Sequence, residues 1–192
     1  KEKYDKILKQ NSTNKIYIET NHCFIKGFGW YLSKFLNCNE VGIIILHRDK
    51  EKVVKSLVTK VKSAASVLSK KWLITPLKKN PIKRPPIFFI SPRIDYYIIK
   101  CCYRIQMLMN SDRIKINVLQ KLINRYNQQL FEWYYDEIYL MGKKFIDKHK
   151  DITFYHVDIN DINNLQKVFH MLDYFKINPL TSLKKIINKQ VN

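Results

Sequence analysis

Residues 41–46 read VGIIIL, a nearly continuous apolar run. A short run without alternation is typical of a strand that is buried on both faces, as in a parallel sheet covered by helices. Asp49 follows this run and can cap a helix through its side-chain oxygen. The apolar stripe expected for that helix consists of Val53, Val54, Leu57, Val58 and Val61. The segment therefore predicts a buried strand that leads directly into an amphipathic helix.

Two further segments have the composition of strands. Residues 15–20 (KIYIET) alternate between faces and precede a predicted helix over residues 24–36, whereas residues 151–158 (DITFYHVD) precede a predicted helix over residues 160–175. Strands that alternate with helices predict an α/β fold with a parallel sheet and right-handed crossovers. Ligands bind such sheets at the carboxyl ends of the strands, so the residues that follow each strand are the candidates for a site.

The length of 192 residues fits a single domain. Its expected parts are a core (residues 15–70 and 151–179), a helical insertion (about 72–149) and a basic tail (180–192). The insertion begins with a proline-rich, basic segment from Trp72 to Pro92, which we interpret as a solvated loop rather than a lid over an anion. Two helices, Asp95–Met109 and Val118–His149, are expected to complete it.

Charge is the most unusual property of the composition. The formal net charge is +19, which attracts polyanions such as nucleotides, nucleic acid and sulfated glycans. A general bias toward Lys, Ile and Asn would produce the same charge without any function. Lysine is spread along the whole chain and no nucleic-acid-reading motif accompanies it, so we do not expect nucleic acid as the partner.

The chain has no apolar stretch that approaches the ~20 residues needed to span a bilayer. It begins with Lys1 and no apolar signal region follows, so we expect it to be a piece of a longer polypeptide. The four cysteines show no CxxC spacing, which favours reduced thiols and a cytoplasmic location. The cysteines and histidines Cys23, Cys38, His22 and His47 fit no zinc-binding spacing, and we expect no metal.

Two predicted strand ends carry residues suited to anion chemistry. The first ends in Thr20-Asn21-His22, and the second ends in His47-Arg48-Asp49. Ser56 follows Arg48 by about two helical turns, so its hydroxyl could share an anion with the guanidinium group. The alternatives are an ion pair of Arg48 with Asp49 or Glu51, a hydrogen-bonded His22 and a Ser56 without a ligand.

The stretch IIILHRDKEKVVKSL (residues 43–57) resembles the segment with which sulfotransferases hold the 3′-phosphate of their sulfuryl donor. The Arg and Ser of that family fall on Arg48 and Ser56. IYIETNHCF (residues 16–24) is similar to the strand that carries the family's catalytic histidine, which falls on His22. Residues 152–177 resemble the family's late strand and closing helix. The resemblance is closer to bacterial members than to the animal cytosolic enzymes.

This resemblance implies a three-layer α/β fold of the P-loop nucleotide-binding type with 3′-phosphoadenylyl sulfate (PAPS) as donor. His22 would act as the base toward a hydroxyl or amine of an unknown small-molecule or glycan acceptor, Glu19 would be the rival base, and Lys26 would assist. Members of the family open with a Gly/Ser/Thr-rich phosphate loop. No such loop is present, so we expect a fold that is incomplete at its N-terminus and half a donor site.

A second hypothesis follows from the missing loop. The chain would then be a degenerate sulfotransferase-like domain that binds polyanions or a protein partner without catalysis. The coding sequence upstream of Lys1 discriminates between the two hypotheses, because a strand followed by a Gly- and Ser/Thr-rich turn would restore the donor site.

Overall fold

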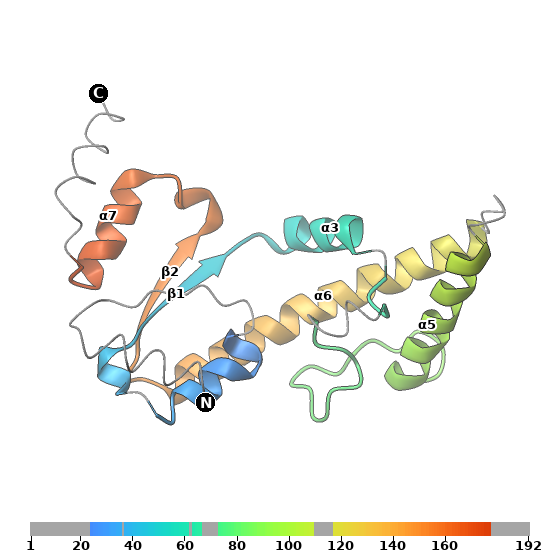
Figure 1. Cartoon of the computed structure of the whole chain (residues 1–192), viewed down its shortest axis with the longest axis horizontal. Helices are drawn as coiled ribbons and strands as arrows, with labels where there is room; N and C mark the ends of the chain where they lie inside the picture. The colour runs from blue at the N-terminus through green and yellow to red at the C-terminus, as the bar shows by residue number, and fades with distance from the viewer. Residues whose placement is uncertain (1–23, 36, 62, 67–72, 110–116, 178–192) are drawn as a thin grey trace.

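The structure, a computed structural model, describes residues 24–35, 37–61, 63–66, 73–109 and 117–177. It has mixed α/β architecture and is mostly helical (Figure 1). The elements in chain order are η1 (Phe24–Phe28), α2 (Gly29–Leu32), η2 (Cys38–Glu40), β1 (Gly42–His47), α3 (Lys50–Lys60), α5 (Pro92–Met109), α6 (Asn117–Lys148), β2 (Thr153–Asp158), η4 (Ile159–Asp161) and α7 (Leu165–Tyr174).

The strands β1 and β2 form a two-stranded parallel sheet within the described part of the chain. Gly42 pairs with Thr153 and His47 pairs with Asp158, so the two strands are in register from end to end. Two of the three predicted strands and their parallel direction are therefore confirmed. The third predicted strand, residues 15–20, lies outside the described residues.

Helices contact both faces of this sheet. On one face, Tyr155 of β2 packs against Tyr174 and Phe175 at the end of α7, with ring centroids 5.1 and 6.1 Å apart. On the other face, Phe154 of β2 meets Phe145 of α6 edge to face at 6.2 Å. Successive residues of a strand point to opposite faces, which explains how neighbouring aromatic residues serve two different helices.

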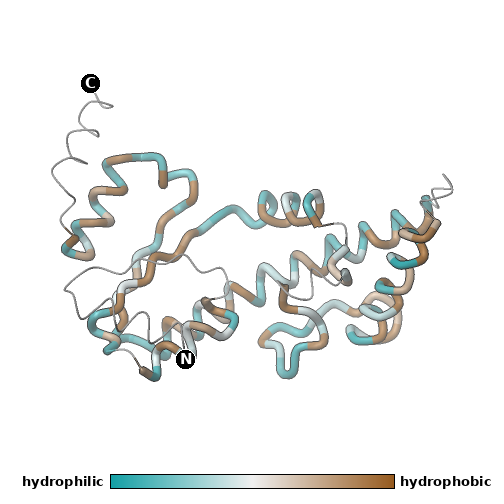
Figure 2. Tube along the Cα trace, in the orientation of Figure 1, coloured by the Kyte–Doolittle hydropathy of each residue, from teal (hydrophilic) through white to brown (hydrophobic). Residues whose placement is uncertain are grey.

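The sequence predicted that β1 is buried on both faces, and the structure corrects this. Ile44 and Leu46, which share a face, are 44% and 56% exposed, whereas Ile43 and Ile45 on the other face are half-buried. Figure 2 shows the apolar trace of β1 becoming hydrophilic where the chain passes to α3. The difference arises because α7 contacts the sheet near Gly42 and does not extend over the carboxyl half of β1.

Gly42 permits the close approach of α7. A Cβ atom on this residue would lie 2.6 Å from the Phe175 ring, well inside van der Waals contact. We expect Gly42→Ala to destabilise the protein by about 1 to 3 kcal/mol, the usual cost of overpacking. The free energy of unfolding in urea measures this. Gly142→Ala on α6, where nothing lies within 4 Å of the added atom, is the matched control and should be neutral or stabilising. An equal loss in both variants would contradict the expectation.

The helix α3 forms as predicted. The Asp49 carboxylate accepts a hydrogen bond from the Lys52 backbone N–H at 2.9 Å and so caps its first turn. Val54, on the predicted apolar stripe, is 2% exposed and packs with residues of α6. Figure 1 shows α3 lying alongside the middle of α6.

The hydrophobic core cluster of the described residues lies mainly in the predicted helical insertion, where α5 packs on α6. Val54 of α3, Ala64 and Ala65 join it from outside the insertion. Its buried members are Val54, Ala64, Ala65, Tyr96, Ile99, Ile123, Tyr126, Leu130, Phe131 and Trp133. The helix α6 extends about 48 Å at ~1.5 Å per residue, so it reaches from this core to the sheet. Its aromatic run is therefore mainly a packing surface, although Tyr139 is exposed.

The proline-rich segment contains no helix or strand over its described residues 73–91, as predicted. It is nevertheless fixed to the helices by two buried carboxylates. Asp95 accepts hydrogen bonds from the backbone N–H groups of residues 88–90. Glu137 accepts from the backbone N–H groups of Ile82 and Lys83 and from the Lys78 ammonium group. A segment tied down in this way does not have the freedom of a lid.

Two predicted helices have different limits in the structure. Gly27, inside the π-helical turn η1, has an extended φ of 163° and kinks the segment. The turn η1 and the short helix α2 therefore take the place of one helix over residues 24–36. The last helix begins at Leu165 instead of Asn160, because the Asp158 carboxylate binds the backbone N–H of Asn160 and stabilises a 3₁₀ turn. Among the described residues, no helix combines the length and the apolar character that a membrane crossing requires.

Candidate functional site

Two histidines meet at the carboxyl end of the sheet. His47 Nε2 and His156 Nδ1 lie 2.6 Å apart, and the two rings are stacked with their centroids 4.9 Å apart. One ring must donate the shared proton and the other accept it, so the pair cannot take up a second proton without repulsion. Burial and the charge of His47 both lower the pKa of His156. His156 therefore stays neutral to a lower pH than an isolated histidine and can serve as one partner of the shared proton.

Arg48 follows this pair directly. Its backbone carbonyl accepts a hydrogen bond from the Tyr135 hydroxyl at 2.9 Å, which fixes the position of the chain above α6. Its side chain is exposed, and no carboxylate of the described residues pairs with its guanidinium group. The ion pair with Asp49 or Glu51 is not formed, since Asp49 is engaged as the cap of α3. Within the described ranges, the guanidinium group could therefore bind an anion without breaking a salt bridge.

Lys26, in η1, contacts the same turn of α6. Its ammonium nitrogen lies 5.4 Å from the centroid of the Tyr134 ring, within the range of a cation–π contact. Tyr134 is the immediate neighbour of Tyr135, which binds the Arg48 backbone. Lys26 and Arg48, two of the residues selected from the sequence, therefore each contact α6, at the successive residues Tyr134 and Tyr135. Successive side chains of a helix do not face each other, so these contacts do not bring the two cations together.

The next residue of α6, Asp136, neutralises two other cations. It pairs with Lys50 at 2.6 Å and with Lys83, which reaches it from the proline-rich segment. Burial raises the pKa of this carboxyl group, but the hydrogen bonds and charges of the two lysines outweigh burial and lower it overall. Asp136 is therefore ionised at neutral pH, and Arg48 is left as the exposed cation that lacks a carboxylate partner at the end of β1 among the residues described.

The structure does not join Ser56 to Arg48. Ser56 is half-buried on α3, and no hydrogen bond links its hydroxyl group to the described residues. The other candidates, His22 and Glu19, lie outside the described residues, so the structure places neither of them.

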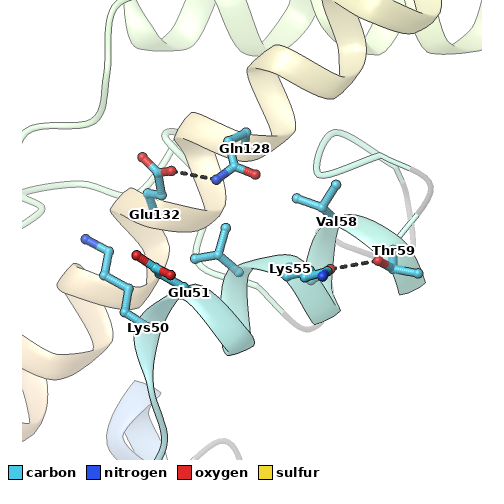
Figure 3. A pocket seen from close by; sticks show the side chains of 8 residues that line it. Lys50, Glu51, Lys55, Val58, Thr59, Gln128 and Glu132 are labelled. Atoms are coloured by element: carbon cyan, nitrogen blue, oxygen red, sulfur yellow. Dashed lines mark hydrogen bonds between the residues drawn. The ribbon is translucent and has the colours of Figure 1, made fainter.

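A groove of about 570 Å³ lies between parts of α3 and α6 (Figure 3). Its lining contains two lysines, Lys50 and Lys55, and two glutamates, Glu51 and Glu132. Glu132 accepts a hydrogen bond from Gln128 at 2.6 Å on the α6 side. The opposite charges balance, so this groove has no preference for a polyanion. Arg48 and Ser56 do not line it.

The histidine pair was missed in the sequence. His47 and His156 are more than a hundred residues apart, and only the register of two parallel strands brings them together. The available signal was the position of each histidine, because His47 ends one apolar run and His156 lies in the polar half of the other.

Comparison of the chain with protein-family models, with curated proteins and with solved structures finds no significant match.

Proposed function

We propose that the carboxyl end of β1 binds a phosphate group of a nucleotide, with Arg48 as its anchor. The observation that carries this proposal is the exposed Arg48 side chain, which has no carboxylate partner among the described residues and whose backbone is held by Tyr135. A planar guanidinium group donates two parallel hydrogen bonds to a phosphate. The parallel sheet supports the proposal, because ligands of α/β sheets bind where the strands end.

The nucleotide that the sulfotransferase resemblance favours is PAPS. In this proposal, the hydroxyl or amine of an acceptor attacks sulfur in line with the leaving phosphate, and His22 or Glu19 removes the acceptor's proton. Lys26 stabilises the charge that develops on the sulfuryl oxygens, and Arg48 and Ser56 hold the 3′-phosphate. The 5′-phosphosulfate requires a phosphate loop that this sequence does not contain, so the chain by itself binds one half of the donor.

The second candidate is a domain that binds polyanions or a protein partner without catalysis. The net charge of +19 favours it, because such a field attracts any polyanion. The two candidates differ in stoichiometry and in their dependence on salt. A built nucleotide site binds one ligand, whereas a basic surface binds several and releases them as salt screens the charges.

Removal of Arg48 tests the proposal. We expect adenosine 3′,5′-bisphosphate to bind the chain at one site and Arg48→Ala to weaken this binding by about 10- to 100-fold, as loss of a charge-assisted, bidentate contact does. Isothermal titration calorimetry at two salt concentrations measures the affinity and the stoichiometry. Arg104→Ala is the matched control, since it removes the same charge from an exposed position on α5.

A nucleotide site requires that Arg104→Ala binds like the unchanged protein at both salt concentrations. If both variants weaken binding equally, or if binding disappears at the higher salt concentration in all three proteins, only the charge of the surface attracts the nucleotide. That result would reject the nucleotide site and leave the second candidate.

A further inference from the structure

Three side chains with metal-binding atoms meet at the opposite, amino end of the sheet. Cys38 begins η2, just before β1, whereas His149 follows α6 and Asp151 precedes β2. One ligand atom from each residue lies within 4.8 Å of those from the other two. We propose that Cys38, His149 and Asp151 form a binding site for a zinc ion.

The fold explains why these residues meet. The backbone N–H of Thr153 donates to the carbonyl of Val41 at 3.3 Å, so the segments that enter β1 and β2 run side by side. The backbone N–H of Ile152 donates to the carbonyl of His149, which holds the turn between α6 and β2. Figure 1 shows the end of α6 near the start of both strands. The positions of the three residues therefore follow from secondary structure on each side of the cluster.

The spacing of the ligand atoms suits a tetrahedral ion after a small contraction. Zinc bonds of ~2.0–2.3 Å place neighbouring ligand atoms about 3.3 to 3.8 Å apart. The three side chains would need to move by on the order of 1 Å to close around an ion, which side-chain rotation can supply. Cys38 is not disulfide-bonded and is half-buried. Its thiol donates to the Ser33 carbonyl at 3.7 Å, and zinc binding would replace this weak hydrogen bond.

The surroundings of His149 support the zinc site independently of the distances between the ligand atoms. Its Nε2 atom is buried and has no hydrogen-bond partner. The ring packs against Trp30 and Phe145, with centroids 5.9 and 4.5 Å away. The indole N–H of Trp30 donates to the Ile25 carbonyl at 3.1 Å, so it is engaged elsewhere. A buried polar atom without a partner costs free energy, and coordination of a metal ion would compensate for it.

Cys38 and Asp151 form the acidic side of the cluster. The Cys38 sulfur and an Asp151 carboxylate oxygen lie within 4.8 Å of each other. A divalent cation bound between them would be held by a thiolate and a carboxylate, and the thiol would release its proton to solvent on binding. Asp151 is exposed and gives the ion a route from solvent, while the neighbouring Lys150 is paired with Asp147.

The ligand types select the ion. Sulfur and imidazole nitrogen favour Zn²⁺ over the hard cations Mg²⁺ and Ca²⁺, which prefer sites made of oxygen atoms. Three protein ligands leave a fourth position for a water molecule. This site does not depend on the proposed nucleotide site, because the two lie at opposite ends of β1 and β2.

Zinc binding is tested on the full chain by competition with a chromophoric chelator. We expect one Zn²⁺ per chain, no displacement by excess Mg²⁺, and an affinity at least about tenfold lower in Cys38→Ser and in Asp151→Asn. Cys101→Ser, which changes an exposed cysteine of α5, is the matched control and should bind like the unchanged protein. Substitution of Co²⁺ should give a thiolate-to-cobalt charge-transfer band that Cys38→Ser abolishes.

Circular dichroism shows whether each variant is folded. If Cys38→Ser does not fold, Asp151→Asn decides, because this exposed substitution leaves the aromatic packing unchanged. The proposal is overturned if zinc does not bind with a stoichiometry of one, if Asp151→Asn binds it as tightly as the unchanged chain, or if the cobalt-bound protein lacks the thiolate band.

Discussion

Asp95→Ala is expected to lower the free energy of unfolding by about 3 to 4 kcal/mol, because it removes a buried carboxylate and leaves three backbone N–H groups without their acceptor. The Asp95 side chain is 0% exposed, and its carboxylate accepts from Phe88 at 2.6 Å, Ile90 at 2.9 Å and Phe89 at 3.2 Å. In urea denaturation, the loss appears as a lower midpoint concentration, while the slope of the unfolding free energy against urea concentration stays unchanged. Asp173→Asn, an exposed substitution on α7, is the control and should change little.

The same carboxylate contributes to acid unfolding. Burial raises the pKa of Asp95, but the backbone hydrogen bonds from residues 88–91 outweigh burial and lower it overall. Its contribution to stability is therefore complete above about pH 4, the ordinary range of an Asp carboxyl in an unfolded chain, and is lost as the pH falls toward the lower folded-state pKa. Asp95→Asn should weaken this acid dependence. A variant that kept the full dependence would show that other carboxylates cause it.

Glu137→Gln should release the proline-rich segment and cost about 2 to 4 kcal/mol. Glu137 is 0% exposed, and its two oxygens accept from the Ile82 and Lys83 backbones at 3.0 and 2.8 Å. A glutamine keeps the shape but presents an N–H₂ group to one of these donors and loses its charge toward Lys78.

Limited proteolysis with trypsin tests the local part of this expectation, since the segment contains Lys78, Lys79 and Lys83. Faster cleavage there in Glu137→Gln than in the unchanged protein is expected, together with a lower midpoint in urea. Glu51→Gln is the matched control, because Glu51 is exposed and makes no hydrogen bond through its side chain with the described residues. Cleavage at the same rate in all three proteins would mean that Glu137 does not restrain the segment.

The sequence predicted the features that depend on neighbouring residues. The apolar run of β1, the Asp49 cap and the long amphipathic α6 are each determined within a few turns or strand residues, and they appear within a few residues of their predicted limits. The order of strands and helices was sufficient to predict a parallel sheet, but not that β1 pairs with β2.

Features that depend on distant pairs could not be predicted. Lys26 approaches Tyr134, and His47 approaches His156, only because separate elements pack together. The same holds for burial, since the apolar composition of β1 does not reveal that α7 leaves Ile44 and Leu46 accessible. The sequence pattern placed Arg48 at the end of a strand, where an anion could bind. The structure adds that Asp49, its alternative ion-pair partner, caps α3 instead.

The wide separation of β1 and β2 along the chain has a consequence for biosynthesis. Their first paired residues, Gly42 and Thr153, are roughly 110 residues apart, so at about 5 to 20 residues per second β1 leaves the ribosome roughly 5 to 20 s before its partner is made. During that interval the backbone N–H and C=O groups at its edge can pair with strands of other nascent chains, and its isoleucine side chains are exposed. The helices α5 and α6, which pack on each other through shorter separations, can fold within this time. The emerging protein is therefore most exposed to aggregation before residue 153 is translated, and a chaperone that shields β1 would act in that period.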